Sequence, residues 1–391
     1  MMPPPLCTDL SAGQVHFLPG PKDQPKKSSD PLVSGWADLS VSAVVEDGEI
    51  GPSLDRDMLR MLWGRPLQLF RLAGFMARQR GAGWVTYVVN RNINFTDICV
   101  GSCSFCAFRK DVGYRLSDSD ILSRVEEAED LGATEVCLQG GLNPDLSLED
   151  YCRMLELIKE GHPAMHLHAY SPMEVWHMAR SSGVSVKEAI ADLKSAGLGS
   201  MPGTAAEILV DRVRQEICPG KLSVSEWCSV IRTAHRLGIR TTSTMLYGHI
   251  ESLEDRLTHL EVLLRLQAET GGFTEFVLLP FLPENCSLGP MARKPDILEH
   301  LKMHALSRVA LHNYIPNIQA SWVKLGPEVA GAAIEWGVND MGGTLMEENI
   351  SRSAGSTSGQ YLSPSQIRAI IAAHGRKPAQ RDTLYRVIKT S

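Results

Sequence analysis

Apolar and polar positions follow two different periods between about residues 84 and 350 of this chain. Short apolar runs predict buried strands, and longer segments with apolar residues three or four positions apart predict helices. The predicted strands are Val85–Asn92, Glu135–Gln139, Met165–Tyr170, Gly199–Pro202, Arg240–Leu246, Glu275–Pro280, Asn317–Ser321 and Trp336–Asn339. The predicted helices between them are Ser117–Leu131, Leu148–Glu160, Val186–Ala196, Val224–Leu237, Leu253–Glu269, Pro295–Asn313 and Gly326–Glu335.

The regular alternation of these segments predicts an α/β fold. Strands that are separated by helices pair in parallel through right-handed crossovers. Near-eightfold repetition of the unit predicts a (β/α)8 barrel or a partial TIM-type barrel over residues 84–350. In such barrels the chemistry gathers in the loops that follow the strands, so polar residues at strand ends are the candidates for function.

The N-terminal part of the chain has a different pattern. Residues 1–50 contain proline-rich stretches such as Pro19–Pro31, which predict a mobile extension. This extension lacks the apolar core of a secretory signal and indicates an organelle-targeting peptide only weakly. Residues 51–83 predict a helical segment, Leu54–Arg80, which is interrupted at Gly64 and Pro66. We expect its apolar face to cap the end of the barrel.

The C-terminal residues 351–391 predict a helical extension. Its glycine- and serine-rich start is followed by one helix, Ser363–Ala373, which begins with a Ser-Pro pair. A strand-like piece, Asp382–Ile388, has no predicted place.

Composition and charge narrow the classes of function. Lys and Arg number 39 against 45 Asp and Glu, which gives a net charge of −6, so no basic surplus points to nucleic acid. No apolar run of about 18 residues predicts a transmembrane helix. The chain has nine cysteines, an odd number, and most are scattered along it. That pattern suits a reducing compartment, and we expect a cytoplasmic protein.

Three of the cysteines form a motif. Cys99, Cys103 and Cys106 stand directly after the first predicted strand. Thiolates are soft ligands that favour an iron–sulfur cluster or zinc. Three ligands leave one position of a four-iron cluster open, and an open metal position is where chemistry takes place. The alternatives are a structural zinc site with a distant fourth ligand and three unrelated buried cysteines, although the paired cysteine motifs of zinc ribbons are absent from the sequence.

The Cys-x3-Cys-x2-Cys spacing, with Phe105 before the last cysteine, resembles the radical S-adenosylmethionine (SAM) superfamily. Within it, further stretches resemble the group that holds the second subunit of the deazaflavin (FO) synthase and the menaquinone-pathway futalosine enzymes. Those stretches are Tyr87–Cys99, Cys106–Arg109, Leu138–Leu142, His166–Glu174 and Pro202–Glu207. Three more fit the FO synthase subunit best, namely Cys218–Lys221, Thr241–His249 and Asn339–Glu348. The resemblance runs from about Trp84 to the C-terminus.

The resemblance implies a [4Fe-4S] cluster whose fourth iron binds SAM. It implies that one electron cleaves SAM to a 5′-deoxyadenosyl radical, which abstracts hydrogen from L-tyrosine. The 4-hydroxybenzyl group of tyrosine is then joined to 5-amino-6-(D-ribitylamino)uracil in deazaflavin biosynthesis. Because the chain has only one such cysteine triad, we expect a separate radical SAM subunit of the FO synthase to close the ring, and a one-electron donor to supply the cluster.

Two other functions stay open at this point. A menaquinone-pathway enzyme, either the dehypoxanthine futalosine cyclase or the aminofutalosine synthase, would share the cluster and the His-x-His strand. A scaffold that binds a cluster or zinc without catalysis would contain metal but perform no radical chemistry.

The candidate cofactor-binding residues lie at strand ends. Gln139, Gly140 and Gly141 close the second predicted strand, and the resemblance implies that this stretch holds the methionyl amino group of SAM. An ordinary strand-to-helix turn is the alternative. Glu174 and Glu207 follow the next two strands and are candidates to accept from the SAM ribose or ammonium group. Each is also suited to the first turn of a helix, where acids are favoured by the helix dipole.

The candidate catalytic residues are His166, His168 and Tyr247. The two histidines are two positions apart in a strand, so both point to one face, which we expect to be the barrel interior. There they would orient the substrate or move protons, because histidine titrates near neutrality. Histidines that are simply buried in the core, and a metal site, are the alternatives. Tyr247 stands at the end of a hydroxyl-rich strand.

The remaining candidates are expected to contact the substrate, because amides, hydroxyls and acids in a barrel mouth suit a polar ligand. They are Asn90, Asn92, Thr242, Thr244, His249, Asn339 and Asp340. The asparagines are equally suited to capping the loop backbone, and the acids of the last loop to a solvated position. Cys99, Cys103 and Cys106 complete the predicted site as the metal ligands.

Overall fold

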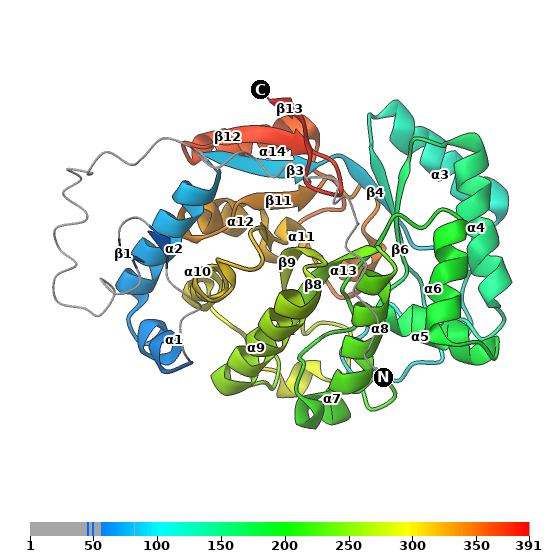
Figure 1. Ribbon diagram of the computed structural model, residues 1–391, viewed down its shortest axis with the longest axis horizontal. Coiled ribbons are helices and arrows are strands. Elements are labelled where there is room, and N and C mark those ends of the chain that lie inside the picture. Colours follow the sequence, from blue (N-terminus) through cyan, green and yellow to red (C-terminus); the bar gives the residue numbers. More distant parts are fainter. Residues whose placement is uncertain (1–44, 47–48, 51–55, 82, 391) are drawn as a thin grey trace, which may run out of the picture.

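The computed structural model describes residues 45–46, 49–50, 56–81 and 83–390, and Figure 1 shows how its elements are arranged. From residue 84 onward, strands alternate with helices. The strands of the main sheet are β3 (Trp84–Val88), β4 (Asn90–Ile93), β5 (Glu135–Leu138), β6 (His166–Ala169), β7 (Ser200–Met201), β8 (Arg240–Tyr247), β9 (Phe273–Pro280), β10 (Ile318–Ala320), β11 (Asp340–Gly343), β12 (Lys377–Arg381) and β13 (Val387–Thr390). The predicted α/β fold with a curled parallel sheet is confirmed.

The sheet curls because β3 and β4, which follow each other directly in the chain, pair with opposite ends of the series of strands that runs from β11 to β5. Only Val89 separates β3 from β4, yet β3 pairs in parallel with β11 and β4 pairs in parallel with β5. The neighbouring strands between them run in the order β11, β10, β9, β8, β7, β6, β5. The backbone N–H of Asn92 also donates to the carbonyl of Leu345, 2.8 Å away. The row of strands therefore returns to the stretch from which it started, as in a barrel.

Most helices cover the outside of the sheet (Figure 1). They are α3 (Asp118–Asp130), α4 (Leu148–Gly161), α5 (Pro172–Ser181), α6 (Val186–Ser195), α7 (Asp211–Ile217), α8 (Val224–Arg236), α9 (Leu253–Thr270), α10 (Ile297–Leu311), α11 (Trp322–Leu325), α12 (Pro327–Ala333), α13 (Asn349–Ser353) and α14 (Pro364–Ala373). Short 3-10 turns lie at Gly289–Met291 and Ile334–Trp336.

A repeated local sequence starts many of these helices. In α4 the Ser147 hydroxyl accepts from the Asp150 N–H, and the Asp150 carboxylate accepts from the Ser147 N–H. The same reciprocal cap starts α3, α5, α6, α8, α9 and α14. Each cap satisfies backbone donors that the first helical turn leaves without partners, so a serine followed three residues later by an acid or glutamine fixes where the helix begins.

The two faces of each barrel strand have different surroundings. On β5, Val136 and Leu138 are fully buried in the apolar core, whereas Glu135 and Cys137 line a cavity. Alternate residues of a strand point to opposite faces, so the apolar face meets the helices and the other face meets the barrel interior. TIM barrels are commonly filled by layers of side chains, but here the interior leaves room for a ligand.

The N-terminal helical segment forms two helices, α1 (Arg56–Trp63) and α2 (Pro66–Gly81), which are separated at the predicted break. α2 packs along α10 and against the 3-10 turn before β11, where the rings of Phe70 and Trp336 are 5.0 Å apart. Figure 1 shows α1 and α2 at the flank of the molecule, beside α10. The segment therefore belongs to the outer helix layer, and the prediction that it caps the end of the barrel is wrong.

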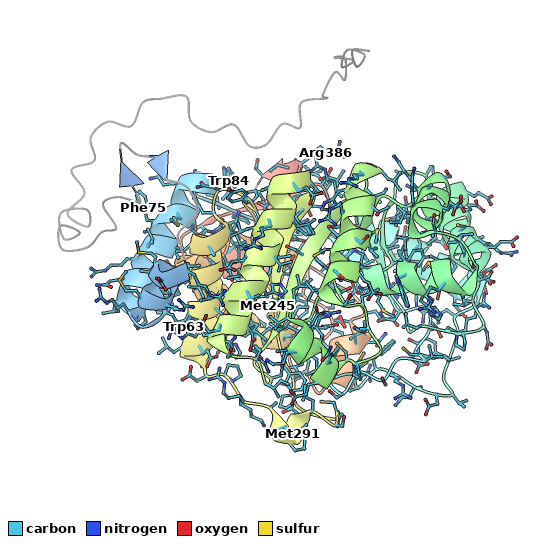
Figure 2. The ribbon with its side chains drawn as sticks, turned by 60° about the horizontal axis from the view of Figure 1, so that its bottom comes forward. Trp63, Phe75, Trp84, Met245, Met291 and Arg386 are labelled. Carbon is cyan, nitrogen blue, oxygen red and sulfur yellow. The ribbon has the colours of Figure 1, made fainter. Side chains whose placement is uncertain are left out.

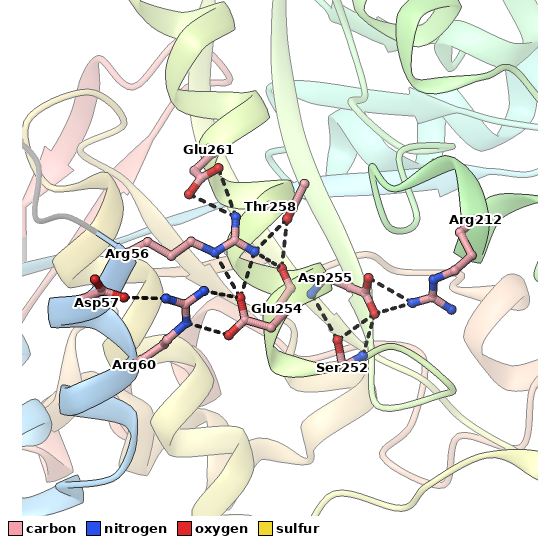
Figure 3. Close-up of polar contacts among 9 residues, drawn as sticks. All are labelled: Arg56, Asp57, Arg60, Arg212, Ser252, Glu254, Asp255, Thr258 and Glu261. Atoms are coloured by element: carbon pink, nitrogen blue, oxygen red, sulfur yellow. Dashed lines mark hydrogen bonds and ion pairs between the residues drawn. The ribbon is translucent and has the colours of Figure 1, made fainter.

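Polar contacts hold α1 against α9 (Figure 3). The Arg56 guanidinium donates to the Glu254 backbone carbonyl and to the Thr258 hydroxyl, each at 2.9 Å, and also bonds Glu261. Arg60 bonds the Glu254 carboxylate, with Nε 2.6 Å from Oε1. Because these groups are largely exposed, each pair contributes little to stability. Their geometry nevertheless fixes how α1 lies on α9.

The C-terminal residues add a β-hairpin to the barrel. β12 pairs in parallel with β3, and β13 pairs antiparallel with β12. In Figure 2, Arg386 in the hairpin turn and Trp84 at the start of β3 lie at one end of the molecule, while Met291 lies at the opposite end. The hairpin thus covers the end at which the strands begin. The prediction of a helical extension was incomplete, and the unplaced piece Asp382–Ile388 is the turn and the start of β13.

Several predicted boundaries differ from the structure. Trp336, the first residue of the last predicted strand, is the last residue of a 3-10 turn, and the strand begins only at Asp340. Gly337 has φ of 125°, which favours glycine, and the Arg308 guanidinium donates to its carbonyl at 2.7 Å. This side-chain bond ends the helical region. The short helices α5, α7, α11 and α13 were not predicted.

The extension predicted for residues 1–50 lies outside the described residues, apart from the antiparallel pair β1 (Val45–Glu46) and β2 (Glu49–Ile50). Among the described helices, every one is too short or too polar to span a membrane.

Candidate active site

A cavity of about 410 Å³ occupies the interior of the barrel. Its walls come from the inward faces of the strands, including Asn90, Cys137, His168 and Thr242. The loop with the three motif cysteines lines it at the C-terminal ends of the strands. Arg381, from the C-terminal hairpin, lines it at the other end. A ligand inside the barrel would therefore touch residues from both the barrel and the C-terminal hairpin.

The three motif cysteines share the cavity wall. Cys99, Cys103 and Cys106 are free, half-buried thiols. A Cβ built on Gly101 would lie 3.2 Å from Cys99 Sγ and 4.0 Å from Cys103 Sγ, so these two sulfur atoms flank the same glycine. The Gly101 N–H also points to Cys99 Sγ at 3.3 Å. Small residues at this turn let the chain wrap closely around whatever the thiols hold.

Backbone bonds from three directions fix the cysteine loop. The Cys99 N–H donates to the Lys110 carbonyl at 3.0 Å, and the Val100 N–H donates to the Leu142 carbonyl at 3.0 Å. The Ser104 N–H donates to the Ile217 carbonyl at 2.9 Å. Because these partners come from the loop itself, the end of β5 and the end of α7, the barrel sets the positions of the thiols.

The donor set fits an iron–sulfur cluster better than a single zinc ion. In the described part of the chain, no three His, Cys, Asp or Glu side chains converge closely enough to hold one metal ion. A cluster does not require such convergence, because each thiolate binds a different iron atom. Burial raises the pKa of the Cys103 thiol, while the nearby Lys221 ammonium opposes this shift and favours the thiolate. Three thiols on the wall of one cavity are thus suited to hold a four-iron cluster with one open position.

Gly140 and Gly141 allow the end of β5 to lie directly under the cysteine loop. A Cβ on Gly140 would lie 2.7 Å from the Phe95 ring, and a Cβ on Gly141 would lie 2.2 Å from the Ile98 carbonyl oxygen. Real side chains do not fit at such distances. The glycines are therefore required by packing, and their backbone also lines the cavity beside the thiols. Gln139 lines it too and donates to the Thr204 hydroxyl at 3.0 Å.

The two candidate acids both line the cavity, but each already has partners. The Glu174 carboxylate accepts from the Gly140 N–H at 3.0 Å and from the Ser171 N–H at 2.7 Å, so it caps α5. Burial raises the pKa of Glu174, and these backbone donors limit the rise. Glu207 pairs with the Lys221 ammonium at 2.6 Å. The contacts of Glu174 match the alternative that it stands in the first turn of a helix. Through its bond to Gly140, the Glu174 carboxylate also fixes the glycine stretch beside the cysteine loop.

The His-x-His strand forms a short polar chain with β7. His166 Nε2 and His168 Nδ1 lie 2.8 and 2.7 Å from the same Ser200 hydroxyl. His168 lines the cavity, whereas His166 lies one layer away from it. Burial lowers the pKa of His168 to about 4, so its ring is neutral at neutral pH. His168 is therefore placed to exchange a hydrogen bond with a ligand, and His166 positions it through Ser200.

The asparagine and threonine candidates line the cavity but mainly hold its walls together. Asn90 donates to Glu135 at 2.8 Å, and Asn92 donates to Glu348 at 3.1 Å. The Thr242 hydroxyl accepts from the Gly203 N–H at 2.8 Å, and the Thr244 hydroxyl donates to the Gly203 carbonyl at 3.0 Å. The Asn90 side-chain oxygen also accepts from the Leu345 N–H at 3.0 Å, so Asn90 caps loop backbone as in the alternative, whereas Asn92 pairs with a side chain.

Besides His166, four predicted site residues lie away from the cavity wall. The Tyr247 hydroxyl bonds His300 of α10 at 2.8 Å, on the outer side of β8. His249 is buried beside Glu251 in the loop after β8. The predicted direct contacts of these two residues with a ligand do not fit these positions. Tyr247 is three residues from Thr244, which lines the cavity, so it points to the opposite face of β8, and His249 lies beyond the end of the strand.

The last two candidates are structural partners of arginines. The Asn339 side chain accepts from the Arg308 guanidinium and from the Ile318 N–H, at 2.5 and 2.9 Å. Asp340 is buried and pairs with Arg381, with Nε 2.5 Å from Oδ2. Neither lines the cavity, because each is taken up by its arginine at the beginning of β11.

Sequence reasoning missed several charged residues of the cavity, chiefly Lys221, Glu275, Lys324 and Arg381. Lys221 belongs to the Cys218–Lys221 stretch, which resembles the FO synthase subunit, so the sequence contained a signal that Lys221 is part of the site. Arg381 and Lys324 gave none, because the first lies in a strand that was not predicted and the second in a helix of four residues that was not predicted.

Two family models match the chain in succession. The model described as "Radical SAM superfamily" matches residues 93–263, and the model described as "CofH/MqnC C-terminal region" matches residues 270–391. The first contains the cysteine motif, and the second contains the hairpin that contributes Arg381.

Curated proteins and solved structures agree with these matches. The 5-amino-6-(D-ribitylamino)uracil--L-tyrosine 4-hydroxyphenyl transferase of Archaeoglobus fulgidus is 52% identical over 323 residues, which cover 83% of this chain and 94% of that protein. The protein of the same name from Methanococcoides burtonii is 49% identical over 344 residues, which cover 87% of this chain and 97% of that protein.

The fold is similar to that of methylornithine synthase (PylB), with a TM-score of 0.68 at 17% identity, covering 84% of this chain and 95% of that one. It is also similar to that of HydG, a maturase of the [FeFe]-hydrogenase, with a TM-score of 0.63 at 15% identity, covering 83% of this chain and 70% of that one. These two structures support the fold alone. The high identity to the curated relatives over most of both chains shows that the chain belongs to the radical SAM superfamily and, within it, to the family of the 5-amino-6-(D-ribitylamino)uracil--L-tyrosine 4-hydroxyphenyl transferases.

Proposed function

We propose that this chain is a radical SAM transferase that joins the 4-hydroxybenzyl group of L-tyrosine to 5-amino-6-(D-ribitylamino)uracil in deazaflavin (FO) biosynthesis. The observation that carries the proposal is the identity of about half of the residues to relatives of that name over more than four fifths of this chain. The cavity supports it, because three free thiols and a set of hydrogen-bonding groups line one space inside the barrel. Substrates and cofactors can therefore meet inside the barrel.

Cys99, Cys103 and Cys106 would hold the [4Fe-4S] cluster, and the backbone of Gly140 and Gly141 would lie against SAM. When bound, the cluster and SAM supply a 5′-deoxyadenosyl radical. The protein would hold the reacting groups in place and exclude water. The backbone bonds within the cysteine loop and from it to the ends of β5 and α7 would hold the reacting groups in place. The C-terminal hairpin would exclude water by covering the end of the barrel at which the strands begin.

His168 is our candidate for a direct substrate contact. Its Nδ1 atom is engaged by Ser200, and no residue in the described part of the chain bonds its Nε2 atom. Because burial keeps the ring neutral, it would bind a phenol or a uracil edge by a hydrogen bond and not by charge. Gln139, Glu207, Thr242 and Thr244 are proposed to shape the same wall.

Two partners complete the proposal. A separate radical SAM enzyme would close the deazaflavin ring after this step, and a one-electron donor would reduce the cluster. We place the reaction in a reducing compartment such as the cytoplasm, because the eight cysteines in the described residues form no disulfide.

A substrate trial tests the proposed function. The purified protein is reconstituted with iron and sulfide without oxygen, and then receives SAM, a reductant, tyrosine and the ribitylaminouracil. Mass spectrometry should find 5′-deoxyadenosine and a coupled adduct whose formation requires both substrates. Omitting one substrate at a time is the control.

The description of the second family model also includes MqnC, so futalosine substrates of the menaquinone pathway form a second trial. Turnover of those compounds and no adduct from tyrosine would reject the proposed function in favour of that alternative. A protein with full iron and sulfide that forms neither product would instead support a scaffold without catalysis.

A further inference from the structure

The charged groups of the cavity wall are almost all paired. Glu207 bonds Lys221, Glu174 bonds backbone N–H groups, and Arg381 bonds Asp340. The other charged lining residues with partners are Arg109, Glu135, Glu275 and Glu348. Among the described residues that line the cavity, Lys324 is the one charged residue whose side chain makes neither a hydrogen bond nor an ion pair within the chain.

The position of Lys324 is fixed by its neighbours. It lies in α11, directly after β10, between the buried residues Trp322 and Val323 on one side and the turn to α12 on the other. The Trp322 indole N–H donates to the Gly343 carbonyl at 2.9 Å, which ties α11 to the end of β11. These contacts fix α11, and with it the backbone of Lys324, at the cavity wall.

The acids close to Lys324 are already occupied. Glu348 and Glu207 are the carboxylates whose charges act on it, together with the Cys106 thiol. Glu348 accepts from the Asn92 amide at 3.1 Å and from the Ser351 N–H at 2.9 Å, and Glu207 accepts from Lys221. Burial lowers the pKa of Lys324, and the nearby charges of Glu348, Glu207 and Cys106 oppose this shift. Lys324 is half-buried on the cavity wall, and its ammonium has no partner among the described residues, so it is available to an anion that enters the cavity.

We propose that the Lys324 ammonium binds the carboxylate of an α-amino-acid ligand inside the cavity. The proposal rests on the proposed function, since both L-tyrosine and the methionyl part of SAM carry such a carboxylate and the ribitylaminouracil carries none. Lys324 is thus a positioning residue for one of these two ligands. Its ion pair would fix the orientation of the amino-acid backbone relative to the cysteine loop.

Equilibrium binding to the reconstituted, unreduced protein tests this proposal without turnover. Tyrosine and SAM are titrated separately into the wild type and into the variants K324M, K324Q and K324R, with tyramine as the analogue of tyrosine that lacks the carboxylate. K187M, which changes an exposed lysine of α6, is the matched control. Circular dichroism and the iron content show that each variant is folded and loaded.

The expected result is a loss of affinity of roughly 10- to 100-fold in K324M and K324Q for the ligand whose carboxylate Lys324 holds. K324R should retain most of the affinity, and K187M should match the wild type. If tyrosine is the ligand, its affinity falls and that of tyramine does not. If SAM is the ligand, the SAM affinity falls and tyrosine binding is unchanged.

Unchanged affinities for both tyrosine and SAM in K324M and K324Q would overturn the proposal. The failure of the proposed function has a different signature, because the wild type would then bind SAM but not tyrosine. In that case the SAM titration alone decides the role of Lys324.

Discussion

Replacing Arg381 by methionine is expected to destabilise the barrel strongly, because this arginine holds two buried acids. Its Nε atom is 2.5 Å from Asp340 Oδ2, and another guanidinium nitrogen is 3.4 Å from Glu275 Oε2. The side chains of Arg381 and Asp340 are 2% and 0% exposed. Methionine fills a similar volume but leaves the Asp340 carboxylate without its counter-charge.

The size of the effect follows from that burial. Removing one partner of a buried ion pair costs about 3–5 kcal/mol, because the remaining charge stays out of water. Replacing both partners by neutral groups costs much less, so the double variant R381M/D340N should recover at least about 2 kcal/mol relative to R381M. The loss in R381M would be felt at the cavity as well, since Arg381 lines it.

Urea unfolding followed by circular dichroism measures these changes at neutral pH. The matched control is R386M in the turn of the same hairpin, whose arginine is 70% exposed and pairs with Asp382. That variant should stay within about 0.5 kcal/mol of the wild type. An R381M protein that unfolds within about 1 kcal/mol of the wild type, or a double variant no more stable than R381M, would refute this account of the C-terminal hairpin.

Three further predictions concern the cysteine loop and the buried acids. C103A should lose the cluster and all SAM cleavage, whereas C137A, whose thiol lines the cavity outside the motif, should keep both. Iron analysis and the formation of 5′-deoxyadenosine measure the two effects. A C103A protein with full SAM cleavage would contradict the ligand assignment. G141A should also lower the iron content, because its Cβ would lie 2.8 Å from the Cys99 Cβ; normal iron loading would show that the loop tolerates the shift. Burial raises the pKa of Glu275 from its ordinary 4.5 to about 7. Between these two pH values the carboxyl keeps its proton in the folded state but has lost it in the unfolded state. The contribution of Glu275 to the free energy of unfolding therefore falls as the pH rises from 4.5 to 7. In E275Q that contribution disappears, and urea unfolding across this pH range should show a flatter profile; an unchanged slope would count against the shifted pKa.

The barrel could be predicted from the sequence because each strand and each long helix carries its own local signal. The capping boxes are an example, since a serine and an acid three residues apart mark the start of a helix without any tertiary information. The cysteine motif was equally visible, because all its ligands lie within one loop. These features depend on residues that are close together in the chain.

The features that were missed depend on residues far apart. Arg381 reaches Asp340 and Glu275 only because β12 pairs with β3 at the edge of the barrel, and such pairing leaves no local signal. The side on which Tyr247 points is a different case, because it could be predicted: Tyr247 is three residues from Thr244, so strand alternation puts the two side chains on opposite faces. Lys324 is a candidate for carboxylate binding only because its side chain has no partner among the described residues that line the cavity. That property depends on the whole site and cannot be seen in a local stretch of sequence.

The central claim is that one cavity brings the aromatic part of tyrosine to the ribitylaminouracil. The most direct measurement uses tyrosine labelled with 13C in its ring, together with SAM, a reductant and the uracil, in the reconstituted protein. Our account predicts that the coupled adduct, isolated by mass spectrometry, carries the full ring label and that it forms in wild type and C137A but not in C103A. An adduct without the label, or no adduct from a protein that cleaves SAM in the presence of both substrates, would contradict it.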